Sequence, residues 1–309
     1  GLRKDDLELF VRLSKLPIDK RLLSNDRIFY YKMRILNKFY SEYGKSGSKT
    51  PLEMYKYFCE IQGNHCTNQS IISYISNIGN SIIDYIKDKP GYIRFTSEDS
   101  SKKKEVDKNM NGTNIFKVGT NFWGMSIDIK CANFTVMKMF DPDIFDGKET
   151  WEQFLKQFTQ HEFLLYSKVF RQEVLGKLNM KRIQSKQLEL IREMISHLKE
   201  NGIEVDGNIN SDEIIISVNK NDLQDFYDKL EKIIKKSEHP EIWRVSIFET
   251  FPLIKYPMSS FYPYIKKTYP IIGYGEWEDT FSLEICCTPK AYITQVIRYI
   301  YREEAHEYD

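Results

Sequence analysis

The stretch that most limits how this chain can fold is residues 203–218, which follow a pattern of strand, tight turn and strand. Asp212 and Glu213 stand at the mouth of that turn, and the isoleucines after them are typical of a β-hairpin. A second acidic strand lies upstream, where Asp128 stands between two isoleucines. Carboxylates on two neighbouring strands can hold a pair of divalent cations, which is the minimum that two-metal phosphodiester chemistry requires.

Composition narrows the function classes only modestly. The 309 residues suffice for a sizeable core and for two or three lobes. The 45 Lys and Arg nearly balance the 44 Asp and Glu, so net charge points to no particular partner. The 20 tyrosines and 19 phenylalanines suit both a core and base stacking. Frequent Lys, Asn, Ile and Tyr are typical of AT-rich genomes, so a viral source is one interpretation.

The cysteines indicate a reducing compartment. There are 5 of them, at positions 59, 66, 131, 286 and 287, and an odd number with an adjacent pair argues against a disulfide framework. We therefore expect the cytoplasm or another reducing intracellular compartment. No apolar run reaches the length of a membrane span, so we expect no membrane contact. The start at Gly1 rather than Met indicates either a cleavage scar or a fragment of something larger, and a larger polypeptide or a replication complex is among the expected partners.

The distribution of polar and apolar residues predicts four segments. We expect a helical N-terminal lobe over 1–95, a linker over 96–114, a central domain over 115–236 and a C-terminal lobe over 237–309. The pair Thr50-Pro51 is typical of a helix cap followed by a first-turn proline. The linker is nearly free of large apolar side chains, so it has little to bury.

The hydrophobic period changes several times in the second half of the chain. Strands are predicted at 115–138, 243–249 and 280–287, and helices at 151–200, 221–236 and after Thr288-Pro289. Asn201-Gly202 is a good stop for the first of these helices. The order strand, long helix, hairpin, helix, strand is satisfied by an antiparallel sheet with helices on one face. We therefore predict an α+β fold with a small C-terminal α/β lobe.

Three segments of the middle of the chain occur in an order with a known parallel. Residues 126–134 combine a strand carrying one Asp with a small residue and then Asn133 and Phe134. Residues 170–186 form a helix with small and basic residues, and Ser211-Asp212-Glu213 form an acidic turn before a hydrophobic strand. Together, over roughly 116–255, they resemble the palm of a template-dependent nucleic-acid polymerase of the reverse-transcriptase and RNA-dependent RNA polymerase kind. The helix is the loosest match, and Glu213 replaces a commoner second Asp.

This resemblance implies a palm-like sheet in an enzyme that binds a primed template and nucleoside triphosphates. It implies that Asp128 and Asp212 hold Mg²⁺ or Mn²⁺ and that Glu213 supports them, because phosphoryl transfer needs charge neutralised on phosphate oxygens. It also implies that Asn133 and Phe134 lie beside the incoming sugar, where an amide favours ribonucleotides. The basic residues of the helix would contact the triphosphate or the template backbone. They are Arg171, Lys177, Lys181, Arg182 and Lys186.

Plainer interpretations of the same residues stay open. Asp212 can serve only to form the turn, Asp128 can be a solvent-facing strand residue, and Asn133 can simply end a strand. The basic helix face can be a solvated surface. A two-metal nuclease of the RNase H-like type is a second function, and it would need parallel neighbours beside the strand of Asp128. A non-catalytic scaffold that binds nucleic acid or a partner chain is a third.

Two further stretches receive no catalytic role. Cys59, His65 and Cys66 supply three potential zinc ligands, but no second Cys or His pair follows at a suitable spacing, so no zinc site is expected. The aromatic stretch 248–274 contains several prolines and is interpreted as core and turns, with a stacking surface for a nucleic-acid strand as the alternative.

Overall fold

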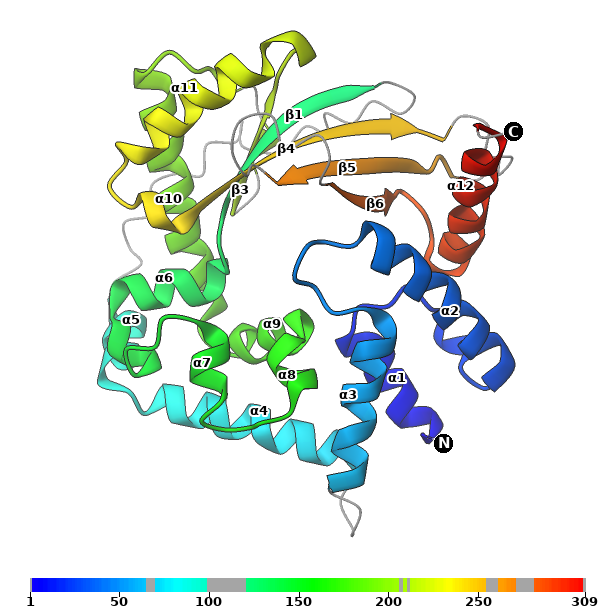
Figure 1. The fold of residues 1–309 in the computed structure, drawn as a ribbon. Helices are drawn as coiled ribbons and strands as arrows, with labels where there is room; N and C mark the ends of the chain where they lie inside the picture. Colours follow the sequence, from blue (N-terminus) through cyan, green and yellow to red (C-terminus); the bar gives the residue numbers. More distant parts are fainter. Residues whose placement is uncertain are drawn as a thin grey trace.

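The computed structural model describes residues 2–64, 70–98, 121–205, 208–209, 212–253, 261–270 and 281–307. One sheet lies above a group of helices that come mainly from the first half of the chain (Figure 1). Helices α10 (Met180–Glu200) and α11 (Leu223–Lys235) pack against one face of this sheet. The α+β class expected from the sequence is confirmed.

The N-terminal part of the chain is helical. Its helices are α1 (Lys4–Leu13), α2 (Asp26–Tyr43), α3 (Pro51–Asn64), α4 (Ile71–Lys87) and α5 (Pro90–Ser97). A capping box starts α3, since the Glu53 amide donates to Thr50 Oγ1 at 3.3 Å and the Thr50 amide donates to Glu53 Oε2 at 2.7 Å. Residues 99–120, which include most of the predicted linker, and the pair His65-Cys66 lie outside the described residues. Of the helices described, none combines the length and apolarity that crossing a membrane demands.

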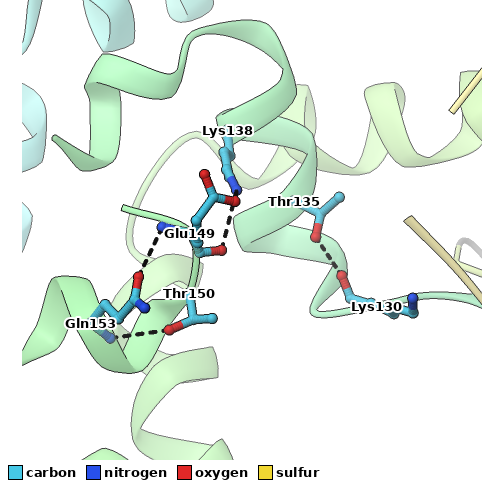
Figure 2. Close-up of polar contacts among 6 residues, drawn as sticks. All are labelled: Lys130, Thr135, Lys138, Glu149, Thr150 and Gln153. Atoms are coloured by element: carbon cyan, nitrogen blue, oxygen red, sulfur yellow. Dashed lines mark hydrogen bonds and ion pairs between the residues drawn. The ribbon is translucent and has the colours of Figure 1, made fainter. Parts of the chain in front are cut away.

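The first strand is shorter than the sequence predicts. Strand β1 covers Phe122–Ile129, Cys131 then adopts the left-handed conformation at φ 46°, and helix α6 covers Ala132–Phe140. The strand predicted to reach residue 138 is therefore wrong in its second half. The hydroxyl of Thr135 donates to the Lys130 carbonyl and holds this turn (Figure 2). A short run of Phe, Val and Met fits either period, and the turn decides for the helix.

The single helix predicted over 151–200 is wrong, because the chain forms four shorter helices there. They are α7 (Trp151–Leu155), α8 (Glu162–Tyr166), α9 (Lys168–Gly176) and α10. The side chains of Thr150, Ser167 and Asn179 each restart a helix by accepting from an amide three residues on, at 3.2, 3.0 and 3.2 Å. Beside the first cap, an ion pair between Lys138 and Glu149 ties α6 to α7 (Figure 2). Helix α10 ends where predicted, with Gly202 at φ 75°.

The sheet is antiparallel in all its described pairs and follows the order β2–β3–β1–β4–β5–β6. The strands after β1 are β2 (Asn208–Ile209), β3 (Glu213–Ser217), β4 (Trp243–Pro252), β5 (Tyr264–Pro270) and β6 (Ser282–Cys286). The predicted hairpin is confirmed as β2 and β3, although its turn residues 210–211 lie outside the described residues. The order along the chain is β1, a helical crossover, β2, β3, α11 and β4. Strands β3 and β4 with helix α11 between them form a split βαβ unit, because β1 lies between these two strands in the sheet.

Strand β5 is missed by the sequence-based interpretation of 248–274 as core and turns. Pro252 and Pro270 stand at strand ends and Pro263 precedes β5, so these prolines interrupt no ladder from within. Strands β4, β5 and β6 continue the central sheet instead of forming the separate small lobe expected from the sequence. The last helix, α12 (Ile293–Glu307), lies beside α2 (Figure 1).

Two hydrophobic cores hold these layers together. The first joins helices α1–α9 with α12, and in it the rings of Phe58 and Phe163 lie 4.9 Å apart. The second lies between the sheet and helices α10 and α11, where Ile127 and Ile191 are both fully buried. Burying a side chain of this size stabilises the fold by about 1.5–3 kcal/mol. The predicted division at residues 95, 115 and 237 stays a prediction, but the packing of α6–α9 with the N-terminal helices cuts across it.

Candidate functional site

Alternation along β1 separates the two faces of the sheet. Ile127 and Ile129 enter the second core, where they are 0% and 3% exposed, so Asp128 between them points to the opposite face. Asp128 lies across from Glu213 of β3 and Arg244 of β4. On strands β3, β1 and β4 this opposite face carries hydrophilic residues, and we call it the polar face. Its residues are Ser126, Asp128, Glu213, Arg244 and Ser246.

The carboxylate of Asp128 is engaged by Arg244. Arg244 Nε donates to Asp128 Oδ1 at 3.0 Å, and its Nη2 donates to Oδ2. The planar guanidinium matches both oxygens of a carboxylate, and the hydrogen bond to Asp128 raises the pKa of Arg244. The Asp128 side chain is 22% exposed and that of Arg244 is 57% exposed. Any metal ion at Asp128 must therefore share this carboxylate with Arg244 or displace the guanidinium.

Glu213 is fixed on the same face by a serine. Ser126 Oγ donates to Glu213 Oε1 at 2.5 Å, across the β1–β3 pair. Because Ser126 and Asp128 are two residues apart on one strand, their side chains share a face. The carboxylate of Glu213 is thereby held beside that of Asp128.

Asp212 completes a cluster of three acids. It directly precedes β3, and its carbonyl accepts from the Ile129 amide at 3.0 Å, which holds it at the end of β1. Partial burial raises the pKa of Asp212, and the negative charges of Glu213 and Asp128 raise it further, while the ammonium of Lys168 opposes them. The structure thus brings together the three acids that the sequence selected. We call Asp128, Asp212 and Glu213 the acidic cluster.

A cation that the sequence did not single out, Lys168, lies close enough to this cluster to act on the pKa of Asp212. Lys168 is the first residue of α9, whose cap Ser167 also donates to the Leu13 carbonyl at 2.7 Å and so joins α9 to the end of α1. The Lys168 side chain reaches solvent, yet partial loss of water around it lowers its pKa. Repulsion by neighbouring cations, Arg244 among them, lowers the pKa further. We call Lys15, Lys45, Lys168 and Arg171 the basic cluster.

Asn133 lies in the first turn of α6, so the interpretation that it ends a strand is wrong. Its Oδ1 accepts from Gln187 Nε2 of α10 at 2.7 Å, and Gln187 is 3% exposed. Within the described part of the chain the amide nitrogen of Asn133 makes no hydrogen bond, so it is available as a donor. The buried glutamine therefore orients the side chain predicted to meet the sugar.

Two residues predicted to contact substrate are buried away from solvent. Phe134 is 4% exposed and its ring centre lies 4.4 Å from that of Phe145. Arg182 is 7% exposed, pairs with Glu98 at 2.5 Å and lies over the Phe95 ring at 5.7 Å. Neither offers a surface to a ligand in this arrangement, so their predicted contacts with substrate gain no support.

The remaining basic residues of the predicted helix divide into two groups. Arg171 lies within the electrostatic range of Lys168 and belongs to the basic cluster. Lys177 and Lys181 are exposed, at the end of α9 and in the first turn of α10. Lys186 pairs with Glu189 on its own helix at 3.0 Å. Of the predicted set, only Arg171 is therefore placed near Lys168.

The donor set suits a cation that arrives with a phosphate. Within residues 2–64, 70–98, 121–205, 208–209, 212–253, 261–270 and 281–307, no three His, Cys, Asp or Glu side chains are grouped to hold a metal ion. Mg²⁺ needs no such group, since it binds through one or two carboxylates and completes its shell with phosphate and water. Asp128 and Asp212 carry carboxylates of the kind that such a cation uses.

Comparison with known proteins finds no match among family models, curated proteins or solved structures. The function has to be inferred from the residues of the site.

Some of those residues were open to sequence-based prediction and others were not. Arg244 alternates with Trp243 and Val245, so a strand there already predicts that it points away from both. Its contact with Asp128 depends on which strands are neighbours, which alternation does not reveal. Lys168 follows the good helix cap Ser167, but the prediction of one continuous helix concealed that start.

Proposed function

We propose that this chain is a template-dependent nucleotidyltransferase that acts on the polar face of its sheet and favours RNA synthesis. The observation that carries this proposal is that a group of carboxylates lies within electrostatic range of a group of cations. The acidic cluster lies at one end of β1 and β3, and Lys168 of the basic cluster acts on Asp212 within it. Phosphoryl transfer needs carboxylates for divalent cations next to cations for phosphate oxygens.

Each residue of the site then has its own task. Asp128 and Asp212 hold Mg²⁺ or Mn²⁺, which would neutralise charge on the attacking and leaving oxygens. Lys168 and the free amides at the start of α9 receive the triphosphate. Asn133, oriented by Gln187, donates its amide hydrogen to the ribose hydroxyl. Glu213 supports the cluster from its bond with Ser126.

The sheet topology favours a palm over the nuclease of RNase H-like type. Such a nuclease would need parallel neighbours beside the strand of its first acid. Strand β1 instead has antiparallel neighbours on both sides, β3 and β4. The antiparallel sheet, with α10 and α11 against the face opposite the acidic cluster, matches the helix-backed sheet expected of a palm-like fold.

A palm-derived scaffold without catalysis is the second candidate. The Arg244 contact favours it, because a carboxylate bonded at both oxygens by a guanidinium is already neutralised. The two candidates differ in one measurable property, the binding of Mn²⁺ at Asp128. A polymerase requires it and a scaffold does not.

The deciding experiment incubates the purified chain with a labelled primed template, nucleoside triphosphates and Mg²⁺ or Mn²⁺. Extension of the primer supports the polymerase and shortening supports the nuclease. A primer that is neither extended nor shortened supports the scaffold, provided that calorimetry also detects no Mn²⁺ binding that depends on Asp128 and Asp212.

Matched variants test the residues in an extending chain. Asp128→Asn and Asp212→Asn should each abolish extension with little change in melting temperature, because each removes a charge and keeps the shape. Glu213→Gln should be milder. Asp225→Asn on the exposed side of α11 is the control and should extend normally. Near-normal turnover in both of the first two variants would make the metal assignment wrong.

A further inference from the structure

Helix α2 turns a basic and aromatic face to solvent. Arg27, Tyr31, Arg34 and Lys38 follow one another at intervals of four, three and four residues, so their side chains lie along one side of the helix. All of them are exposed, and Tyr30 stands beside the row. From Arg27 to Lys38 the row is about 16 Å long, at 1.5 Å per residue.

The orientation of this face is set by the core on the other side of α2. Phe29, Met33, Leu36 and Phe39 are each no more than 1% exposed and belong to the first core. Rotation of the helix would withdraw these side chains from the core and lose the free energy of their burial. The exposed row is therefore a fixed feature of the surface.

The tyrosines of this face offer open rings. Tyr30 is 46% exposed and Tyr31 is 50% exposed, which is high for large aromatic side chains. Tyr30 is held in place, because its hydroxyl lies 3.1 Å from that of Tyr55 on α3 and the two rings are perpendicular. Within the described residues Tyr31 makes no hydrogen bond or ring contact. Rings presented in this way can stack on planar ligands.

The cations of this face form no ion pair with a described residue. Arg27 and Arg34 form no hydrogen bond, ion pair or ring contact with any described residue. Lys38 lies over the Tyr301 ring of α12 at 4.4 Å, a contact that keeps its charge. The nearby Glu42 accepts from the Tyr301 hydroxyl at 2.8 Å and keeps its negative charge, so one carboxylate stands beside the three cations of the row. The face therefore attracts a polyanion.

We propose that the exposed face of α2 binds single-stranded nucleic acid. Cations at this spacing suit consecutive phosphates, and exposed tyrosine rings suit unstacked bases, a combination that a lipid headgroup or an acidic peptide uses only in part. In Figure 1, α2 lies far from α10 and α11, which cover the opposite side of the sheet. This binding surface needs neither metal nor catalysis, so it stands whether or not the proposed function does.

The test is fluorescence anisotropy with labelled single-stranded DNA and RNA oligonucleotides, without metal, over a range of salt. Arg27→Gln with Arg34→Gln should weaken binding and flatten its salt dependence by about 1.4 in log–log slope, since each phosphate contact on a single strand contributes about 0.7. Tyr31→Ala should weaken binding about tenfold by removing a stacking ring, and Tyr31→Phe should keep it.

Controls separate this site from unspecific attraction. Lys199→Gln with Lys232→Gln removes the same charge from exposed positions on α10 and α11 and should leave affinity and slope unchanged. Equal loss in this control, or unchanged affinity in Tyr31→Ala, overturns the proposal. Binding to phosphatidylserine vesicles without binding to oligonucleotides also overturns it and assigns the face to an anionic membrane instead.

Discussion

Arg244 and Asp128 face each other across strands β1 and β4, and the guanidinium bonds both carboxylate oxygens. Under the proposed function, a metal ion at Asp128 would have to share this carboxylate with the guanidinium or displace it. The negative charge of Glu213 also raises the pKa of Arg244, so the guanidinium partly neutralises Glu213 as well as Asp128. Metal binding and the Arg244 contact are in competition under the proposed function.

This competition predicts that Arg244→Met tightens Mn²⁺ binding. The gain should be roughly fivefold, because an exposed ion pair contributes at most about 1 kcal/mol. Isothermal titration calorimetry measures it without any need for activity. Arg171→Met, which removes a cation that makes no bond to Asp128, is the matched control and should change affinity less. Weaker Mn²⁺ binding in Arg244→Met would show that the arginine positions Asp128 instead of competing at it.

Because Lys168 of the basic cluster begins α9, removing a lysine at this end of the helix should affect triphosphate binding more than removing one at the other end. Lys168→Met should raise the apparent KM for nucleoside triphosphate about tenfold or more, since a hydrogen bond to a charged group contributes about 1.5–3 kcal/mol. Lys177→Met, at the far end of the same helix, should leave KM unchanged. Steady-state primer extension gives both values. An equal effect of the two changes would return Lys168 to the status of a general surface charge.

The bond between Asn133 and Gln187 predicts a shared effect on sugar selection. Asn133→Ala should narrow the preference for ribonucleotides several-fold, because one hydrogen bond contributes about 0.5–1.5 kcal/mol. Gln187→Leu should narrow it too, by leaving Asn133 unoriented, and Asn133→Tyr should reverse it by filling the space of the hydroxyl. The measurement is the ratio of kcat/KM for ribo- and deoxyribonucleotides on one template. A ratio that none of these substitutions moves removes the support for RNA synthesis.

The contact between Lys89 and Asp146 predicts a stability effect that depends on pH. Burial by itself would raise the pKa of Asp146, but hydrogen bonds from Lys89 and Tyr85 outweigh it and lower the pKa below its ordinary 3.8. A carboxyl with a lowered folded-state pKa stabilises the fold above its unfolded pKa, and this contribution is lost as pH falls through the folded one.

Lys89→Met should therefore lower the free energy of unfolding by about 0.5–1 kcal/mol near neutral pH and by less in acid. Urea unfolding of the variant and the parent chain, once near neutral pH and once in acid below the pKa of Asp146, measures the difference in the free energy of unfolding. Lys87→Met, exposed on the preceding helix, is the control and should have little effect at either pH. A loss that stays the same in acid would place the effect in the packing of the lysine stem.

Much of the fold could be predicted because its signals are local. The hairpin of β2 and β3, helix α11 and the end of α10 at Gly202 follow from periodicity and from one glycine. The face of Asp128 follows from its two isoleucine neighbours. Where a local signal was ambiguous the prediction was wrong, as at Cys131, where a short apolar run fits a strand or a helix equally well.

The amino-acid sequence by itself determined that this protein is α+β, that Asp128 lies on a strand and turns away from a buried face, and that Asp212 and Glu213 open the neighbouring hairpin strand. Only the tertiary structure decided that Arg244 meets Asp128, that the charge of Lys168 reaches Asp212, and that Phe134 and Arg182 are buried. The physical reason is range. Alternation and capping act over a few residues, whereas strand neighbours and buried side chains are selected by the free energy of packing between segments far apart in the chain.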